Sequence, residues 1–523
     1  MENIVHDDRE RSPSKAARIT SFCLSLARRL PRTKVGLLGR LQDIDDRARE
    51  DFDRDVAGCQ PPAGSRLTYN GFILFEIYPI ELFDELRIAL TRLFPGLHRP
   101  FAQDEFNPDF ESAASIMAGR WWRRMGILCS PRNVGRFIPH DQITSVELPS
   151  DVEYIEVELR KTWPTAFVVI FNVHLENNGR DETATILERI EPRVELRRLF
   201  PLSRLGLSVQ FWSLRQDLRD STRRIRNRTQ SAVERKLRRY FHGFFSRAYR
   251  HRVCRLPSID VLTLDGAPAG GDEYAQWMVA NLGWCDAKWL DVLDDCFISD
   301  KIAWIRHAPI VGRPPIHSIV VRSAALTSED ERFHQSRASA ISGIVEEIVQ
   351  HLSTWISTEA MLWHIEQTLA ERFREVEVLL ASRPRLRKYH KIQDLVIRDG
   401  LLLDRLALDL SWNKRAFNDL ESPDMLFRRY QRRDRHLGAG PASLKNDLSA
   451  ALERRHKYLK DCVDYLRRAT TDVVAAATLQ VNVRLQKQVL WLTFAAVGVA
   501  AVGTIIALAT NWDSALKFWK AIT

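Results

Sequence analysis

The strongest signal for binding chemistry in this 523-residue chain is a basic segment at residues 215–255. It contains 14 Lys or Arg and three acids, a surplus of eleven positive charges, whereas the whole chain carries only +10. Arginine clusters bind phosphate groups, and the aromatic residues between these arginines could stack on bases or enter a lipid interface. The sequence therefore predicts a site for an anionic partner, either anionic lipid or nucleic acid. The site residues are Arg223, Arg224, Arg226, Arg228, Arg235, Lys236, Arg238 and Arg239. The alternative is an amphipathic helix with a solvated basic face and an aromatic core face.

An acidic segment follows, "CDAKWLDVLDDCFISD" at residues 285–300. If it is helical, Asp291, Asp294 and Asp295 share one face and could hold a hydrated divalent cation. A surface helix that pairs with the basic segment is the alternative. A divalent cation is the one cofactor that the sequence suggests.

Local signatures of catalysis are missing from the sequence. It contains no GxxxxGK[ST], GxGxxG after a strand, HExxH or GxSxG. "YIEVELRK" carries Glu156, Glu158 and Lys161, residue types found in nuclease sites, but alternating Glu on the solvent face of a hairpin explains it more simply. His174 and His317 fall in strands, where we expect structural histidines. The sequence does not predict an enzyme, although a membrane-tethered enzyme with a site assembled from distant residues stays an alternative.

The elements that would position these residues begin after a polar, basic N-terminus at residues 1–32. Residues 33–326 alternate strand and helix signals and predict an α/β or α+β domain. We expect strands at 71–79, 154–161, 165–175, 206–212, 259–265, 301–308 and 316–323. The second and third of these resemble an antiparallel hairpin, and "AFVVIF" is continuously apolar, as in a strand covered on both faces. A helix at 182–191 would supply part of that cover.

Residues 327–442 predict helices only. Thr327 is the expected N-cap of one or two long helices that reach Ser382, and another helix spans 391–420. A final helix begins near Ser443 and meets no Gly or Pro until Gly498.

The first part of that final helix, residues 443–488, predicts a stalk. Apolar residues recur at alternating steps of three and four, which is typical of a coiled-coil seam. The stalk seam comprises Leu452, Leu459, Cys462, Leu466 and Val473. Two interpretations stay open, namely pairing with a second copy of the chain and packing against the preceding helices of the same chain.

Residues 489–510 form 22 consecutive uncharged positions. At about 1.5 Å per residue they extend roughly 33 Å, enough to cross a hydrocarbon core of about 30 Å. We therefore expect one membrane span followed by a short tail at 511–523, which could cross the membrane or lie in the interface. The first 60 residues hold no apolar run of signal-peptide length, and basic residues lie close before the span, so the bulk of the chain is expected in the cytoplasm at the inner or cytoplasmic membrane. Seven scattered cysteines without a CxxC pair agree with a reducing compartment.

An α/β domain, a helical region and one very long helix that enters the membrane resemble, in that order, the CorA family of divalent-cation channels. That family ends its first span with a Gly-Met-Asn signature and crosses the membrane again. Here "LATNW" offers only Asn511 at a comparable place, and the eleven residues after Trp512 are too few for a second span.

Two functions follow from these patterns. The first is a single-span, membrane-anchored protein whose cytoplasmic domain senses or scaffolds an anionic partner, and which forms homo-oligomers through stalk and span. The alternative, implied by the resemblance, is a CorA-like oligomeric divalent-cation channel. The span has only Thr493, Thr504 and Thr510 as polar residues, and a water-lined pore usually needs more, which favours the anchor.

Overall fold

The structure of the chain is a computed structural model. The described residues are 43, 46, 50, 66–94, 121–136, 142–163, 165–176, 194–198, 207–211, 214–249, 256–266, 295–298, 301–306, 316–326, 337–381, 386–417, 426–430 and 442–523. They divide into two compact units. Unit 1 is Met1–His364 with Ala407–Arg454, and unit 2 is Ile365–Leu406 with Arg455–Thr523.

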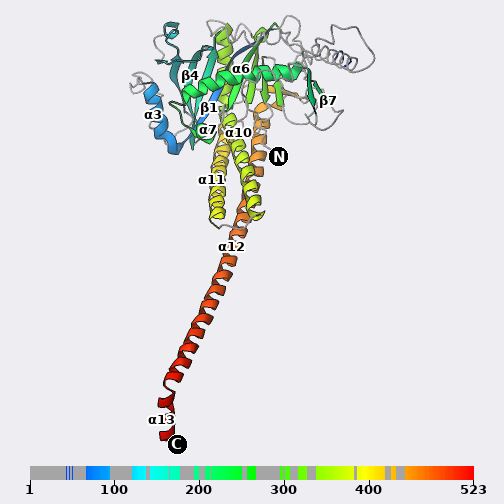
Figure 1. Cartoon of the computed structure of the whole chain (residues 1–523). Coiled ribbons are helices and arrows are strands. Elements are labelled where there is room, and N and C mark those ends of the chain that lie inside the picture. The colour runs from blue at the N-terminus through cyan, green and yellow to red at the C-terminus, as the bar shows by residue number, and fades with distance from the viewer. Residues whose placement is uncertain are drawn as a thin grey trace. The chain divides into compact units, whose positions relative to one another are not determined.

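Unit 1 is built on one mixed sheet (Figure 1). Eleven of the described strands follow each other in the order β13-β12-β9-β10-β11-β8-β1-β5-β4-β2-β3. Their bounds are β1 Arg66–Pro79, β2 Trp121–Cys129, β3 Ile143–Ser145, β4 Val152–Trp163, β5 Ala166–Leu175, β8 Ser258–Asp265, β9 Asp295–Ile298, β10 Ile302–Arg306, β11 Ile316–Arg322, β12 Leu426–Tyr430 and β13 Ala442–Ser443. A separate pair joins β6 (Val194–Arg198) to β7 (Leu207–Phe211).

The neighbouring strands are antiparallel except for two parallel pairs, β2 with β3 and β8 with β11. The predicted hairpin is confirmed, because β4 and β5 pair antiparallel. The central position of "AFVVIF" is confirmed too, since residues 166–171 are all buried between β1 and β4. The apolar runs of β1, β5 and β11 are rich in β-branched and aromatic residues, which favour strands.

Helices lie on both faces of this sheet. α6 (Leu214–Leu237) and the short α7 (Phe244–Ala248) lie on one face, and the first part of α10 (Arg337–Ala381) lies on the other. The alternation of side chains along β8 and β11 explains which residue meets which helix. Asp260 and Ser318 are register partners and share the α6 face, so that His317, one position away, faces α10. This unit also contains α3 (Phe83–Leu93) and the 3-10 turns η1 (Ile80–Leu82), η3 (Val134–Arg136) and η4 (Ser323–Ala325).

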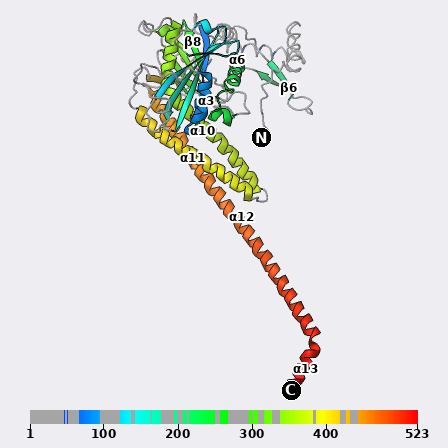
Figure 2. The same ribbon diagram turned by 90° about the vertical axis from the view of Figure 1, so that its left-hand side faces the viewer.

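Unit 2 is helical. It contains the end of α10, most of α11 (Leu386–Phe417) and α12 (Leu444–Thr510) from Arg455 onward, followed by α13 (Trp512–Ile522). α10 and α11 run antiparallel beside this part of α12 (Figure 2). His456 contacts the carbonyl oxygen of Leu403 at 2.8 Å, and Lys460 donates to Asp404 at 3.2 Å. A Cβ at Gly400 would lie 3.2 Å from Val463, so the two helices approach closely there.

The C-terminal half of α12 runs on without a neighbouring segment among the described residues (Figures 1 and 2). The exposed fractions of Leu479, Leu485 and Val499 are 65%, 51% and 74%. Within the described residues, one helix, over Leu448–Thr510, is long and apolar enough to cross a membrane, and none of its most apolar window is buried.

The sequence prediction of the final helix is confirmed, since α12 begins directly after Ser443 and runs unbroken to Thr510. The prediction that 327–442 holds helices only is wrong, because β12 and the start of β13 lie in that range and extend the sheet beside β9. Thr327 and the helix predicted at 182–191 lie outside the described residues.

Candidate functional site

The predicted anionic-partner residues do not form one surface. Arg226 is buried, with a side chain only 3% exposed, and its Nε donates to Asp260 Oδ1 at 2.6 Å. Its terminal nitrogen also donates to Ser258 Oγ. Arg226 is thus an internal ion-pair partner that cannot reach an external phosphate, and the prediction is wrong at this position. Arg223 and Arg224 lie in α6, but their side chains are outside the described residues.

The rest of the predicted set divides by exposure. The side chain of Arg228 is 58% exposed and forms a long ion pair of 3.4 Å with Asp151. Arg235 and Arg239 are exposed, and Lys236 is partly exposed. Arg238 is half-buried, and burial lowers the pKa of its guanidinium. Since Arg228 and Arg235 are seven residues apart, two helical turns, they lie on one face of α6.

The aromatic residues of the basic segment belong largely to the core. Phe241, Phe245 and Tyr249 are buried. Phe241 packs edge-on against Phe171 of β5 with ring centroids 4.9 Å apart. They are not available to stack on bases or to enter a lipid interface, so the segment has the amphipathic arrangement that the sequence offered as the alternative.

The Arg226–Asp260 pair is part of a buried polar network between α6 and the sheet. Tyr69 of β1 donates its hydroxyl to Asp260 at 3.0 Å. Burial raises the pKa of the Asp260 carboxyl, and the neighbouring Arg226 guanidinium opposes that shift. Burial and the Asp260 charge raise the pKa of Tyr69 well above its usual value. The network fixes the position of α6 on β1 and β8.

A second buried acid lies near the end of β1. Glu76 accepts hydrogen bonds from the backbone N–H groups of Phe245 and Ser246 at 2.8 and 3.0 Å. Burial raises its pKa to about 7, although these hydrogen bonds oppose the shift. Beside it lies a cavity of ≈ 10 Å³, which has room for about one water and is also lined by Glu234 and Arg238.

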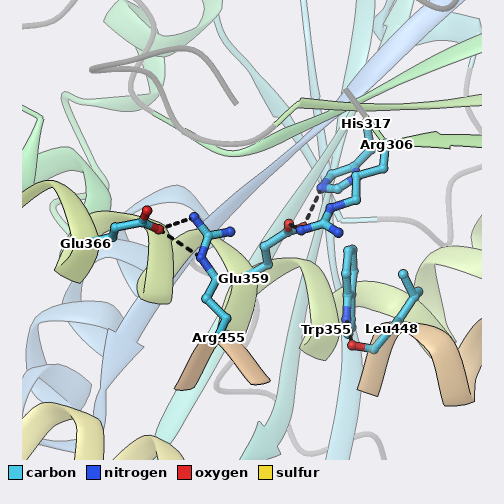
Figure 3. Close-up of polar contacts among 7 residues, drawn as sticks. All are labelled: Arg306, His317, Trp355, Glu359, Glu366, Leu448 and Arg455. Atoms are coloured by element: carbon cyan, nitrogen blue, oxygen red, sulfur yellow. Dashed lines mark hydrogen bonds and ion pairs between the residues drawn. The ribbon is translucent and has the colours of Figure 1, made fainter. Parts of the chain in front are cut away.

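On the opposite face of the sheet, three ionisable side chains meet under α10 (Figure 3). Glu359 of α10 is 3% exposed and pairs with Arg306 of β10. Its second oxygen lies 3.2 Å from Nε2 of His317 in β11, and His317 is fully buried. The imidazole lies between Trp304, stacked with centroids 5.1 Å apart, and the edge of Trp355 at 5.4 Å.

This Arg306–Glu359–His317 cluster ties α10 to two strands. Arg306 also lies over the ring of Trp355, whose Nε1 donates to the carbonyl oxygen of Leu448 in α12 at 2.9 Å. Burial of a paired carboxylate makes the position of α10 specific and makes loss of one partner costly. Among the described residues, no group of His, Cys, Asp and Glu is arranged to hold a metal ion.

Asp295 and Glu158 do not lie where the sequence predicts them. Asp291 and Asp294 lie outside the described residues, and Asp295 begins strand β9, so the single helical face predicted for the three does not extend to Asp295. The expectation of solvent-facing glutamates is wrong for Glu158, which is buried and bonded to Arg160 at 3.1 Å.

The stalk seam falls largely inside the chain's own fold. Leu452 is buried in unit 1, and Leu459 and Leu466, each 1% exposed, are buried in unit 2. These three correspond to the second interpretation, packing within the chain. Cys462 and Val473 are half-buried, and exposed positions dominate from Thr471 onward. In unit 2, Arg455 of α12 pairs with Glu366 of α10 at 3.0 Å (Figure 3).

Sequence reasoning missed the Arg306–Glu359–His317 cluster because its members come from three separate elements. The one available signal was His317 in an apolar strand, which was predicted to be structural.

A comparison of the chain with family models, with curated proteins and with solved structures finds no match.

Proposed function

We propose that the protein is a membrane-anchored scaffold, in which α12 crosses the bilayer and unit 1 meets an anionic partner in the cytoplasm. The observation that carries the proposal is the exposure of the C-terminal half of α12. This uncharged stretch of 22 residues exposes large apolar side chains, and exposure of so much apolar surface to water costs free energy. Trp491 and Trp512 lie near its two ends, where headgroup layers favour aromatic rings.

The cytoplasmic orientation is supported by basic residues just before the apolar part. Arg484 and Lys487 lie within two helical turns of residue 489, and Arg467 and Arg468 lie about six turns before it. Positive charge is retained on the cytoplasmic side of a membrane. The membrane concerned is the inner or cytoplasmic membrane.

Self-association is supported by residues 471–488, which precede the proposed span. Leu479, Val481 and Val483 are 65%, 39% and 48% exposed in the single chain. Leu479 and Val483 are four residues apart and share one side of the helix, and Val481 lies on the opposite side. We propose that other copies of α12 cover them, and that Ala496, Ala500 and Thr504, small residues at steps of four, allow close approach within the bilayer.

The anionic partner would bind the exposed cations of α6 and of the turn after it, Arg228, Arg235 and Arg239. The test changes these three to Gln in the chain lacking residues 485–523, because the span would hold the full chain on any vesicle. Arg132→Gln, an exposed arginine outside α6, is the control. For duplex DNA, losing three phosphate contacts makes the log–log salt slope of binding shallower by up to about 2.7. For vesicles with anionic lipid, binding weakens by up to about 1 kcal/mol per arginine.

Each ligand is tried with both variants. A loss confined to one ligand identifies that partner. If the chain lacking residues 485–523, with its arginines intact, binds neither ligand at low salt, the three arginines are a solvated face and the anionic-partner proposal is withdrawn.

The anchor is tested by flotation with liposomes. The full chain should float with phosphatidylcholine vesicles, and the chain lacking residues 485–523 should stay at the bottom of the gradient. Equal flotation of both proteins would show that a part of the chain other than the end of α12 binds the membrane.

A CorA-like divalent-cation channel is the second proposal. It is supported by the order of a sheet domain, an antiparallel pair of helices and a helix that runs on into an apolar segment. Reconstituted protein would then carry Mg²⁺ or Co²⁺ into vesicles that hold a fluorescent indicator. Flux at the level of empty vesicles would exclude the channel and leave the membrane-anchored scaffold as the remaining proposal.

A further inference from the structure

A separate amphipathic helix, α13, follows the long helix α12. α12 ends at Thr510, and Asn511, with φ −103° and ψ 14°, departs from helical geometry before α13 begins at Trp512. The chain bends at this point in both views of the molecule (Figures 1 and 2). α13 is therefore a separate helix, although one residue joins it to the proposed span.

The two faces of α13 differ in chemistry. At 100° per residue, Trp512, Leu516 and Trp519 lie on one side of the helix, flanked by Phe518 and Ile522. Lys517 and Lys520 lie on the other side. The large apolar side chains are exposed, with fractions of 61% for Trp512 and 70% for Trp519.

We infer that α13 lies flat in the headgroup layer at the far end of the span, with its apolar face against the acyl chains and its lysines at lipid phosphates. The inference rests on the proposed function, because it takes α12 to cross the bilayer. Aromatic and aliphatic residues on one face and Lys on the other are typical of helices that lie in the membrane interface. Lys517 and Lys520 within α13 make a position across the hydrocarbon core costly.

The lipid surface is the favoured occupant because the apolar face is continuous with the end of the span. Trp512 follows the bend directly, and an indole at that depth is at the headgroup level. The lysines would be able to reach phosphate oxygens from the same position. A second copy of the chain is the competing occupant, and the experiment separates the two.

The experiment is photo-cross-linking of the full chain in proteoliposomes. The amino acid p-benzoylphenylalanine replaces Leu516 on the apolar face, Ser514 on the polar side, or Val499 in the middle of the span, and adducts are identified by mass spectrometry. We expect lipid adducts at Val499 and at Leu516, with a yield several-fold lower at Ser514.

The outcomes test the position of α13 and the proposed span of α12 separately. Lipid adducts at Val499 with protein–protein adducts at Leu516 would overturn the interfacial position and leave the anchor intact. Equal lipid yields at Leu516 and Ser514, or none at either, would overturn it as well. Absence of lipid adducts at Val499 would refute the proposed span itself.

A second variant tests the phosphate contacts. Lys517→Gln with Lys520→Gln should lower the adduct yield at Leu516 more in phosphatidylglycerol than in phosphatidylcholine vesicles. Lys457→Gln, exposed and far from the span along α12, is the control and should have no effect. An unchanged yield in the double variant would overturn the assignment of the lysines to lipid phosphates.

Discussion

Replacing Arg226 by Gln tests the buried network that holds α6 on the sheet. The Arg226 and Asp260 side chains are 3% and 4% exposed, and their closest atoms are 2.6 Å apart. Removing one partner of a buried pair leaves the other charge without compensation and costs about 3–5 kcal/mol. For a domain of this size, each kcal/mol lowers the Tm by about 2–4 °C, so we expect a decrease of about 6–20 °C.

The effect of pH on this variant has a definite sign. Burial already raises the pKa of Asp260, and Arg226 is the main influence that lowers it. Without Arg226 the folded-state pKa rises further above that of the unfolded chain, so the folded state binds the extra proton. Stability of the variant should therefore fall as pH rises from the unfolded pKa toward neutrality. Asp260→Asn in the same chain should recover part of the loss.

The assay is thermal denaturation of the detergent-solubilised full chain, followed by circular dichroism. Arg235→Gln, on the exposed side of the same helix, is the control and should change stability by no more than about 0.5 kcal/mol. If Arg226→Gln melts with the control while losing affinity for DNA or anionic vesicles, Arg226 is a surface binding residue. The packing of α6 described above would then be refuted.

Three further changes address other parts of the molecule. Leu459→Asp buries a carboxylate within unit 2 and should cost several kcal/mol, seen as rapid proteolysis of the α10–α11 region; unchanged digestion would contradict its burial. Leu479→Asp should leave that digestion unchanged and abolish chemical cross-links between chains, and persistent cross-links would show that this face does not pair. Because the pKa of Glu76 is raised to about 7 in the folded state, stability should fall by about 3 kcal/mol as pH rises from about 4.5 to 7. Glu76→Gln should flatten that slope in urea denaturation, and an equal slope in both proteins would exclude Glu76 as its source.

The strands that could be predicted from the sequence are β1, β4, β5, β7, β8, β10 and β11. β5 begins with a continuous apolar run, as in a strand covered on both faces, whereas β4 and β8 alternate apolar with polar residues. β2 was missed, since the arginines of "WWRRMGILC" interrupt its pattern. β9 was taken for a helix, because Asp291, Asp294 and Asp295 have helical spacing.

The charged residues were harder to place, because charge and spacing do not reveal which side chains a sheet will cover. Arg226 and Arg228 are two positions apart on α6, yet one is buried against Asp260 and the other is exposed. The deciding contact is with a strand that lies 34 residues further along the chain. Likewise, the helical periodicity at Leu459 and Leu466 is real, but periodicity alone does not tell whether the covering helix belongs to the same chain.

The most direct measurement is alkaline carbonate extraction of membranes from cells that express the full chain, because carbonate releases peripheral proteins and leaves spanning helices in place. If α12 crosses the bilayer, the full chain stays in the membrane pellet and the chain lacking residues 485–523 appears in the soluble fraction. Release of the full chain into the carbonate supernatant would contradict the proposal that α12 spans the membrane.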